Sequence, residues 1–337
     1  MKYSSRFFLY APLGLFLAIA LGLGIHWWLA ASALSARLQA MNGRQIAPGV
    51  TMRFASRRIA GFPFSLDTIF RGVSLRIDTP HGPTEWRPEE FAMHTLTYGR
   101  DKTIFEAAGK QELRWTRDDG STRQLVFAVG SLRASAIEDP LGPTRFDLDL
   151  VGFGSRALTA QRLQLHIRRN APRDTMDVIV EADDVRFSPE DSPALGDQIA
   201  AARLAGTIGG ANAFDAMRAG AETWFAAAER WRKTGGVLRI DTCSLLWGGM
   251  SIDGKGLLAL DDAHRPQGAL GFEISGFSSF LRHIEEARLP RGPNRGLASA
   301  LADRRADVSG HANAVLAFRN GIVMLGGEPA DTLAPLY

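Results

Sequence analysis

Alternation between apolar and polar residues is the pattern that most constrains the fold of this chain. A period of two sends successive side chains to opposite faces of a β-strand. When one set is apolar and the other polar, the pattern favours an antiparallel sheet that is covered on one face and wet on the other. The alternation is strict over residues 73–78, 146–150 and 163–168, and Met176 opens a further run through Glu181. The sequence therefore predicts a body made mainly of antiparallel strands.

Turn-forming residues separate several of these runs. Asn320-Gly321 lies between the apolar segments 315–319 and 322–325, and Asp119-Gly120 lies between 113–116 and 123–129. Such pairs favour tight hairpins because both central positions need a positive φ. A longer hairpin is expected where residues 261–268 join two further strands. The turns support a chain of consecutive hairpins.

Few segments have helical periodicity, and the clearest is 213–233. Asn212 is a candidate N-cap there, and Gly235-Gly236 ends the pattern. Shorter helices are expected over 194–203, 278–288 and 297–305. One apolar stripe follows the main helix, formed by Phe214, Met217, Ala221, Trp224, Ala228 and Trp231.

The N-terminal segment is apolar and long. No charged residue occurs over residues 7–25, Lys2 and Arg6 precede the segment, and Trp27 and Trp28 follow it. At ~1.5 Å per residue, such a run is about long enough to cross the ~30 Å hydrocarbon core as one helix. The alternative is a signal peptide cleaved near Ala33. The length and the interfacial tryptophans favour a retained anchor, with Lys2, Arg6, Trp27 and Trp28 at the membrane interfaces.

These patterns predict a β-dominated α+β fold. A single N-terminal transmembrane helix precedes a curved, mostly antiparallel sheet body with three or four packed helices. The anchor occupies residues 1–36 and the exported body residues 37–337, and the helix at about 213–233 divides the strands. Both one long sheet and two halves are compatible with the pattern. The basic N-terminus favours a body in the periplasm of a bacterium, tied to the inner membrane.

The sequence contains no recognisable catalytic motif. The pairs Glu90/His94 and His283/Glu286 would each supply two ligands, which is too few for a metal site. The single cysteine, Cys243, lies in an alternating run and is expected to pack in a strand. A net charge of +3 gives no reason to expect a nucleic-acid partner. We therefore predict no catalytic, cofactor-binding or metal-binding residues, and a protein that is not an enzyme.

An apolar groove is the candidate site. Leu163, Leu165 and Ile167 share one face of a predicted strand, and Phe62 and Phe64 flank a proline that belongs at an edge or a bulge. The two phenylalanines are candidates for the groove, and the alternative is that they fill one end of the core.

The chain also resembles a known family. Residues 58–66 after the anchor, Leu246-Trp247-Gly248, residues 254–261, the restart at Gly268 and the terminal hairpin are similar to the domain of unknown function 2125 family of alphaproteobacterial envelope proteins. That family in turn is distantly similar to AsmA-type envelope proteins. This resemblance implies one membrane helix, a β-rich periplasmic body and a role in lipid transport or homeostasis.

Three functions are therefore expected, in this order. The first is non-enzymatic lipid handling or envelope homeostasis through an apolar sheet face, with the inner membrane and phospholipid as partners. The second is a scaffold or assembly factor that binds another envelope protein through a sheet edge or apolar patch. The third is a hydrolase with an unrecognised site.

Overall fold

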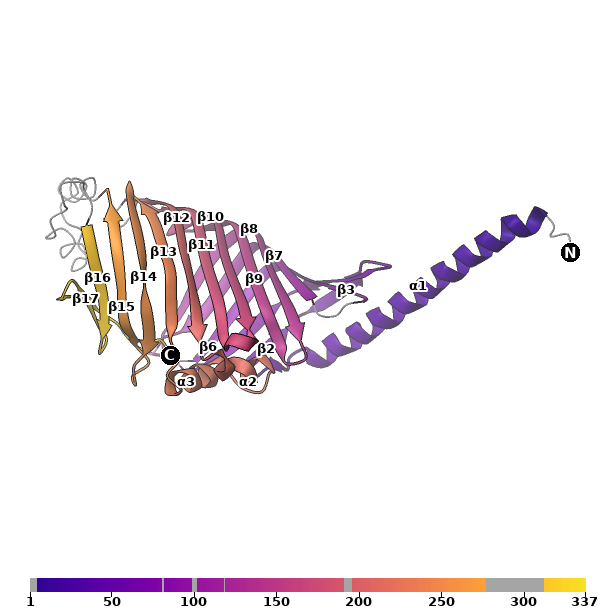
Figure 1. The fold of residues 1–337 in the computed structure, drawn as a ribbon. Coiled ribbons are helices and arrows are strands. Elements are labelled where there is room, and N and C mark those ends of the chain that lie inside the picture. The colour runs from indigo at the N-terminus through magenta and orange to yellow at the C-terminus, as the bar shows by residue number, and fades with distance from the viewer. Residues whose placement is uncertain (1–4, 81, 99–101, 118, 191–195, 277–311) are drawn as a thin grey trace.

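The computed structural model describes residues 5–80, 82–98, 102–117, 119–190, 196–276 and 312–337. The expected helices at 278–288 and 297–305 lie outside these residues, as does the pair His283/Glu286. The protein consists of a long N-terminal helix and a β-rich body, as predicted (Figure 1).

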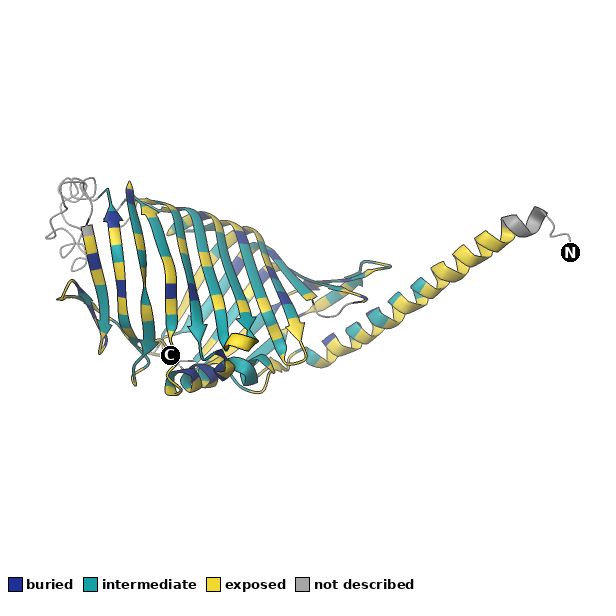
Figure 2. Ribbon diagram, in the orientation of Figure 1, coloured by how far each residue is buried: buried dark blue, intermediate teal, exposed yellow. Residues whose placement is uncertain are grey.

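Helix α1, Ser5–Met41, is the one described helix long and apolar enough to cross a membrane. Its side chains are exposed from Tyr10 to Gly22, whereas Ala31 and Leu38 are buried against the body. Figure 2 shows this change along the helix, from fully exposed residues in the coloured part nearest the N-terminus to a partly covered end. The helix therefore has an unpartnered apolar part and a part that belongs to the body.

The body is one 18-stranded antiparallel sheet, which decides between the one-sheet and two-sheet alternatives. From β5 to β18, each strand pairs with the next along the chain. Strand β2 joins β1 to β5, and the β3–β4 hairpin pairs with the second half of β6. The strands are β1 Gln45–Ala47, β2 Val50–Arg53, β3 Ser56–Ala60, β4 Ser65–Arg71, β5 Ser74–Thr79, β6 Gly82–Leu96, β7 Lys102–Thr116, β8 Thr122–Asp139, β9 Gly142–Ser155, β10 Leu158–Asn170, β11 Thr175–Phe187, β12 Gln198–Gly209, β13 Leu238–Trp247, β14 Met250–Leu260, β15 Pro266–Ser275, β16 Ala312–Arg319, β17 Ile322–Leu325 and β18 Glu328–Thr332.

The sheet is curved, as expected. Figure 1 shows β9–β16 as a wall in front of the slanting strands β2 and β6. The register shifts between Ala107 and Gly109 on β7, and again between β12 and β13. Such bulges bend a strand and increase its twist, which lets so long a sheet curl.

The predicted hairpins are present. Asn320 and Gly321, at φ 54° and 76°, connect β16 to β17 in the predicted two-residue turn. Residues 261–265 connect β14 to β15, and the loop around Gly120 connects β7 to β8.

The prediction of one continuous helix over 213–233 is wrong. The segment forms a short 3₁₀ turn η2 (Ala211–Phe214), the short helix α2 (Asp215–Arg218) and the helix α3 (Trp224–Lys233). Gly220 takes φ 69°, a conformation that ends a helix and that glycine adopts without strain. Thr223, rather than Asn212, caps α3, since its hydroxyl accepts a hydrogen bond from the Ala226 amide at 3.3 Å. The predicted end of the helix before Gly235 is confirmed.

The helix expected over 194–203 is also wrong, because Gln198–Gly209 is strand β12. Its alanines have high intrinsic helix propensity. That preference is overridden because β12 pairs along its length with β11 on one side and β13 on the other.

A hydrophobic cluster joins α1 to the first strands. Leu38 of α1 packs with Phe70 and Phe91, both buried, and Leu34 lies against the same cluster. The Arg57 guanidinium on β3 donates hydrogen bonds to the Ser35 carbonyl at 2.7 Å and to the Gln39 side chain at 2.6 Å. The second part of α1 is therefore held to the body by both packing and polar contacts.

Candidate functional site

One face of the sheet is apolar from β6 to β16. Residues directly opposite each other in paired strands share a face of the sheet. Following the pairing from strand to strand therefore traces a row of neighbouring side chains. The row is Met93, Phe105, Ala134, Leu148, Leu165, Val180, Leu204, Cys243, Gly254, Phe272 and Ala314. We call the surface that carries this row the apolar face.

The adjacent row, on the opposite face, is polar throughout. It is Glu106, Arg133, Asp149, Gln164, Glu181, Arg203, Ser244, Asp253, Glu273 and Asn313. We call this surface the polar face. Each of its residues is the sequence neighbour of one apolar-row residue, so along these two rows apolar and polar side chains lie on opposite faces of the sheet from β7 to β16.

Ion pairs between strands satisfy much of the polar face. The Arg133 guanidinium lies 2.5 Å from the Glu106 carboxylate, and Arg203 contacts Glu181. The Arg162 guanidinium donates to Asp149 at 2.7 Å, which lowers the pKa of that carboxyl from its usual range. Such exposed pairs contribute little to stability individually. The ion pairs indicate that the polar face is exposed to solvent.

The apolar face is only partly covered by the described residues. At its N-terminal end, Phe91 and Ala107 are buried with Leu38 of α1. Farther along, Leu163, Leu165 and Ile167 are each half-buried, and Val180 is 44% exposed. Apolar area left in water costs about 25 cal/mol per Å². A half-covered apolar surface of this extent is therefore suited to an apolar ligand.

Helices α2 and α3 are positioned along one rim of the sheet (Figure 1). Arg218 is 8% exposed as a side chain and donates to the carbonyl of Pro143 at 2.7 Å and to Asp215 at 2.7 Å. Arg169, 3% exposed, contacts Asp215 and Asp174. These arginines tie α2 to the ends of β9 and β10, and Arg218 also contacts Asp139 at the end of β8.

An aromatic pocket of about 650 Å³ lies where α3 approaches β7 and β8. Trp224 and Phe225 of α3 meet Tyr337, with the Trp224 and Tyr337 rings 5.7 Å apart. Leu113 and Leu125, opposite each other on β7 and β8, line the other wall. The pocket therefore presents further apolar surface at the rim that carries the helices.

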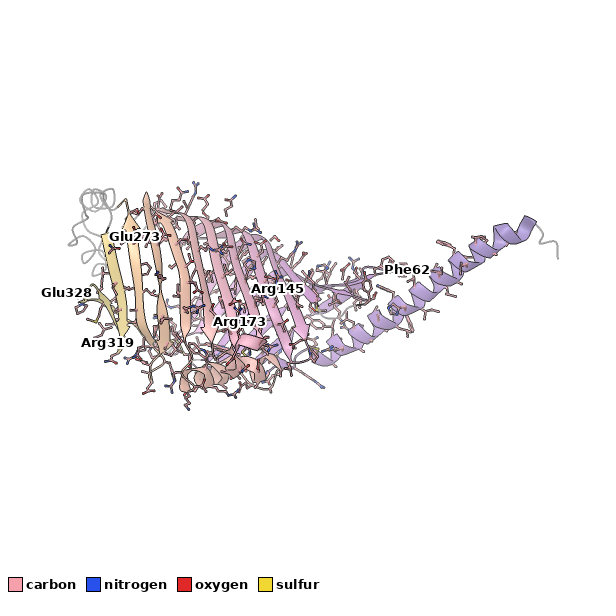
Figure 3. All side chains as sticks on the ribbon, in the orientation of Figure 1. Phe62, Arg145, Arg173, Glu273, Arg319 and Glu328 are labelled. Carbon is pink, nitrogen blue, oxygen red and sulfur yellow. The ribbon has the colours of Figure 1, made fainter. Side chains whose placement is uncertain are left out.

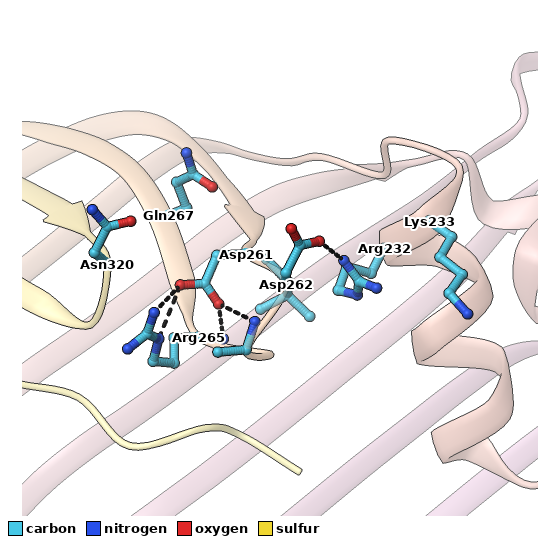
Figure 4. Close-up of a pocket in the computed structure, with 9 residues that line it drawn as sticks. Arg232, Lys233, Asp261, Asp262, Arg265, Gln267 and Asn320 are labelled. Atoms are coloured by element: carbon cyan, nitrogen blue, oxygen red, sulfur yellow. Dashed lines mark hydrogen bonds and ion pairs between the residues drawn. The ribbon is translucent and has the colours of Figure 1, made fainter.

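A charged pocket lies at the far end of α3 (Figure 4). Arg232 lies 2.6 Å from Asp262 and 2.9 Å from Glu229, while Arg265 lies 2.9 Å from Asp261. The Arg232 and Lys233 side chains hold the pKa of Glu229 down to about 2. Because these cations already have carboxylate partners, the pocket is better explained as a clamp between α3 and the β14–β15 turn than as an anion site.

The structure separates the predicted groove residues into two places. Leu163, Leu165 and Ile167 lie together on the apolar face, opposite Leu150, Leu148 and Phe146. Phe62 and Phe64 lie instead at the tip of the β3–β4 hairpin, 59% and 55% exposed, where they neither line the apolar face nor fill the core. Phe62 contacts Trp27 of α1 at 5.9 Å between ring centroids.

The predicted interface residues are only partly described. Trp28 is 61% exposed, and Trp27 is partly covered by the hairpin. Lys2 and the side chain of Arg6 lie outside the described part of the chain.

Glu90, His94 and Cys243, the described candidates for chemistry, do not come together in one site. His94 Nδ1 lies 2.8 Å from the Asp67 carboxylate. Glu90 and His94 both lie on β6, where a separation of four residues is about 13 Å along an extended strand. Among the described residues, no three metal-ligating side chains meet. Burial raises the pKa of the Cys243 thiol, which makes it a poor nucleophile and suits a packed side chain.

Sequence reasoning missed most of the apolar face. Leu204, Cys243 and Phe272 belong to the apolar face just as Leu165 does. Leu204 and Phe272 lie in segments where small residues interrupt simple alternation, whereas Cys243 lies in an alternating run. Only the strand register shows that the three side chains share a face with Leu165.

Comparison with protein families gives one match. Residues 27–331 match the model of a family described as an uncharacterized protein conserved in bacteria, domain of unknown function 2125. The chain belongs to this family. The family match includes the second part of α1 and nearly the whole sheet, so both faces of the curved sheet lie within the domain of unknown function 2125. No curated protein and no solved structure matches the chain.

Proposed function

We propose that this member of the domain of unknown function 2125 family is a membrane-anchored lipid-handling protein of the bacterial envelope. Helix α1 anchors it in the inner membrane, and the sheet body lies in the periplasm. The acyl chains of phospholipids lie along the apolar face. The protein is not an enzyme in this proposal, which agrees with the role implied by the resemblance of its sequence to AsmA-type proteins.

The continuous apolar row is the observation that carries this proposal. It crosses ten strand-to-strand steps from β6 to β16, or roughly 48 Å at ~4.8 Å per step. One acyl chain spans about half of the ~30 Å hydrocarbon core, or roughly 15 Å. The face is therefore long enough for more than one acyl chain in series, which exceeds what a single small apolar ligand requires.

A scaffold role is the second candidate, and one feature favours it. On the opposite face, β14–β17 surround a depression of about 1040 Å³ lined by Leu257 and Val315, which are 53% and 50% exposed. An exposed apolar patch of this kind is typical of a protein-binding surface. The edge strand β18 is short and contains Pro329, which disfavours binding through that edge.

Lipid carried by purified full-length variants tests the proposal. We expect Leu165→Glu and Val180→Glu to lose most of the phospholipid that co-purifies in detergent, measured by mass spectrometry. A carboxylate on the apolar face would have to be desolvated beside the acyl chains. Val180→Glu adds little folding cost, because Val180 is 44% exposed.

Gln164→Glu is the matched control, since Gln164 precedes Leu165 and lies on the polar face. It adds the same charge and keeps the same α1, so lipid bound around the anchor is equal in all variants. We expect it to retain the lipid. Equal lipid content in the three variants would favour the scaffold role instead.

A further inference from the structure

Three exposed side chains gather at one tip of the body. Phe62 and Phe64, in the β3–β4 turn, are 59% and 55% exposed, and Tyr98, just beyond β6, is 61% exposed. The Thr97 amide donates to the Phe64 carbonyl at 3.1 Å, which places the two chain segments side by side. We call Phe62, Phe64 and Tyr98 the aromatic tip.

The aromatic tip lies beside the membrane helix at a defined height. The Trp27 indole N–H donates to the Ser65 carbonyl at 2.8 Å, and its ring meets Phe62 edge-on at 5.9 Å. Figure 3 shows Phe62 on the hairpin that reaches along α1, at the opposite end of the body from Glu328. The tip therefore lies level with Trp27, just beyond the continuously exposed apolar part of α1 that ends at Gly22.

This level is the membrane interface if α1 spans the bilayer. The apolar segment of α1 before Trp27 is about long enough to cross the hydrocarbon core. Tryptophan and tyrosine favour the headgroup region, where one part of the ring is apolar and another polar. Exposed aromatic rings beside such an anchor are therefore better accommodated in the headgroup region than in water.

We propose that the aromatic tip is a second membrane contact, in which Phe62, Phe64 and Tyr98 enter the interfacial region of the bilayer that α1 spans. This inference rests on the anchoring by α1 but not on lipid binding to the apolar face. Because Arg57, Leu34 and Leu38 hold α1 to the body, the two contacts fix the tilt of the sheet on the membrane.

The test measures the depth of single labels on the full chain. In a Cys243→Ser background, Phe62→Cys or Phe64→Cys is labelled with an environment-sensitive fluorophore. The protein is reconstituted in phosphatidylcholine–phosphatidylglycerol vesicles with or without nitroxide-labelled lipid. We expect both labels to lose most of their fluorescence to the nitroxide, and Glu328→Cys, at the far end, to lose almost none.

Leu17→Cys, within the apolar part of α1, reports correct insertion. Quenching at residues 17, 62 and 64 but not 328 supports the inference. Quenching at 17 alone overturns it, because the tip then lies in water although the anchor is inserted. The second tip position covers the case in which Phe62→Cys weakens the contact with Trp27. Lipid loading on the apolar face is measured separately, so either proposal can fail without the other.

Discussion

Replacing Phe70 by alanine is expected to lower the free energy of unfolding by about 3–5 kcal/mol, the usual cost of removing a buried aromatic ring. Phe70 is 3% exposed and lies between the rings of Phe54 and Phe91, at 5.2 and 5.7 Å. Leu38 of α1 belongs to the same cluster, so the cavity also weakens the packing of α1 on the sheet. Chemical denaturation of the full chain in detergent, followed by tryptophan fluorescence, measures the loss.

Ile69→Ala is the control for this prediction. Ile69 is the neighbour of Phe70, points to the other face of β4 and is 41% exposed. We expect a loss of less than about 1 kcal/mol, since little buried area is removed. Losses of similar size at the two positions would mean that the cluster does not hold α1 to the sheet.

Trp231→Ala is expected to have an effect of the same order, about 3–5 kcal/mol. Trp231 is 8% exposed, and its indole N–H donates to the Gly209 carbonyl at 2.7 Å. Its ring packs so closely on Gly236 that a Cβ there would overlap it. The substitution removes both the packing and the hydrogen bond that hold α3 to the end of β12, and thermal unfolding should show a clearly lower midpoint.

Trp224→Ala provides the comparison on the same helix. Trp224 is 45% exposed, although its ring contacts Phe225 and Tyr337. We expect a distinctly smaller loss of stability than for Trp231→Ala. If Trp224→Ala is the more damaging change, the burial of α3 described above is wrong.

The elements with strong local signals were predictable from the sequence. The 7–25 segment is within α1, the alternating runs are strands, and Asn320-Gly321 forms the two-residue turn. In each case a short stretch of chain carries its own physical reason, either an apolar length or a demand for positive φ.

Where tertiary pairing decides the conformation, local patterns failed. Residues 198–203 have helix-favouring alanines, but pairing with β11 on one side and β13 on the other stabilises them more as a central strand. The apolar stripe expected over 213–233 is interrupted at Gly220, and within α3 only its later part is buried, since Trp224 is 45% exposed and Trp231 8%. Periodicity does not record such a break.

The candidate site was predictable only in part. The alternation identified Leu163, Leu165 and Ile167, which do share a face. It gave no way to connect them to Leu204 or Phe272, because a shift of one residue in any strand would move its apolar set to the other face. The location of Phe62 beside Trp27 was likewise beyond local reasoning, since 35 positions of chain separate the two residues.

Photocrosslinking in living cells tests lipid binding to the apolar face most directly. A photoreactive phenylalanine analogue is placed at Leu165 in one strain and at Gln164 in another, in the full chain at natural abundance. After irradiation, the intact protein is purified and weighed by mass spectrometry. We predict phospholipid adducts at position 165 and none at position 164, because the two side chains lie on opposite faces of β10. Adducts at neither position, or equally at both, would contradict the proposal that the apolar face holds lipid.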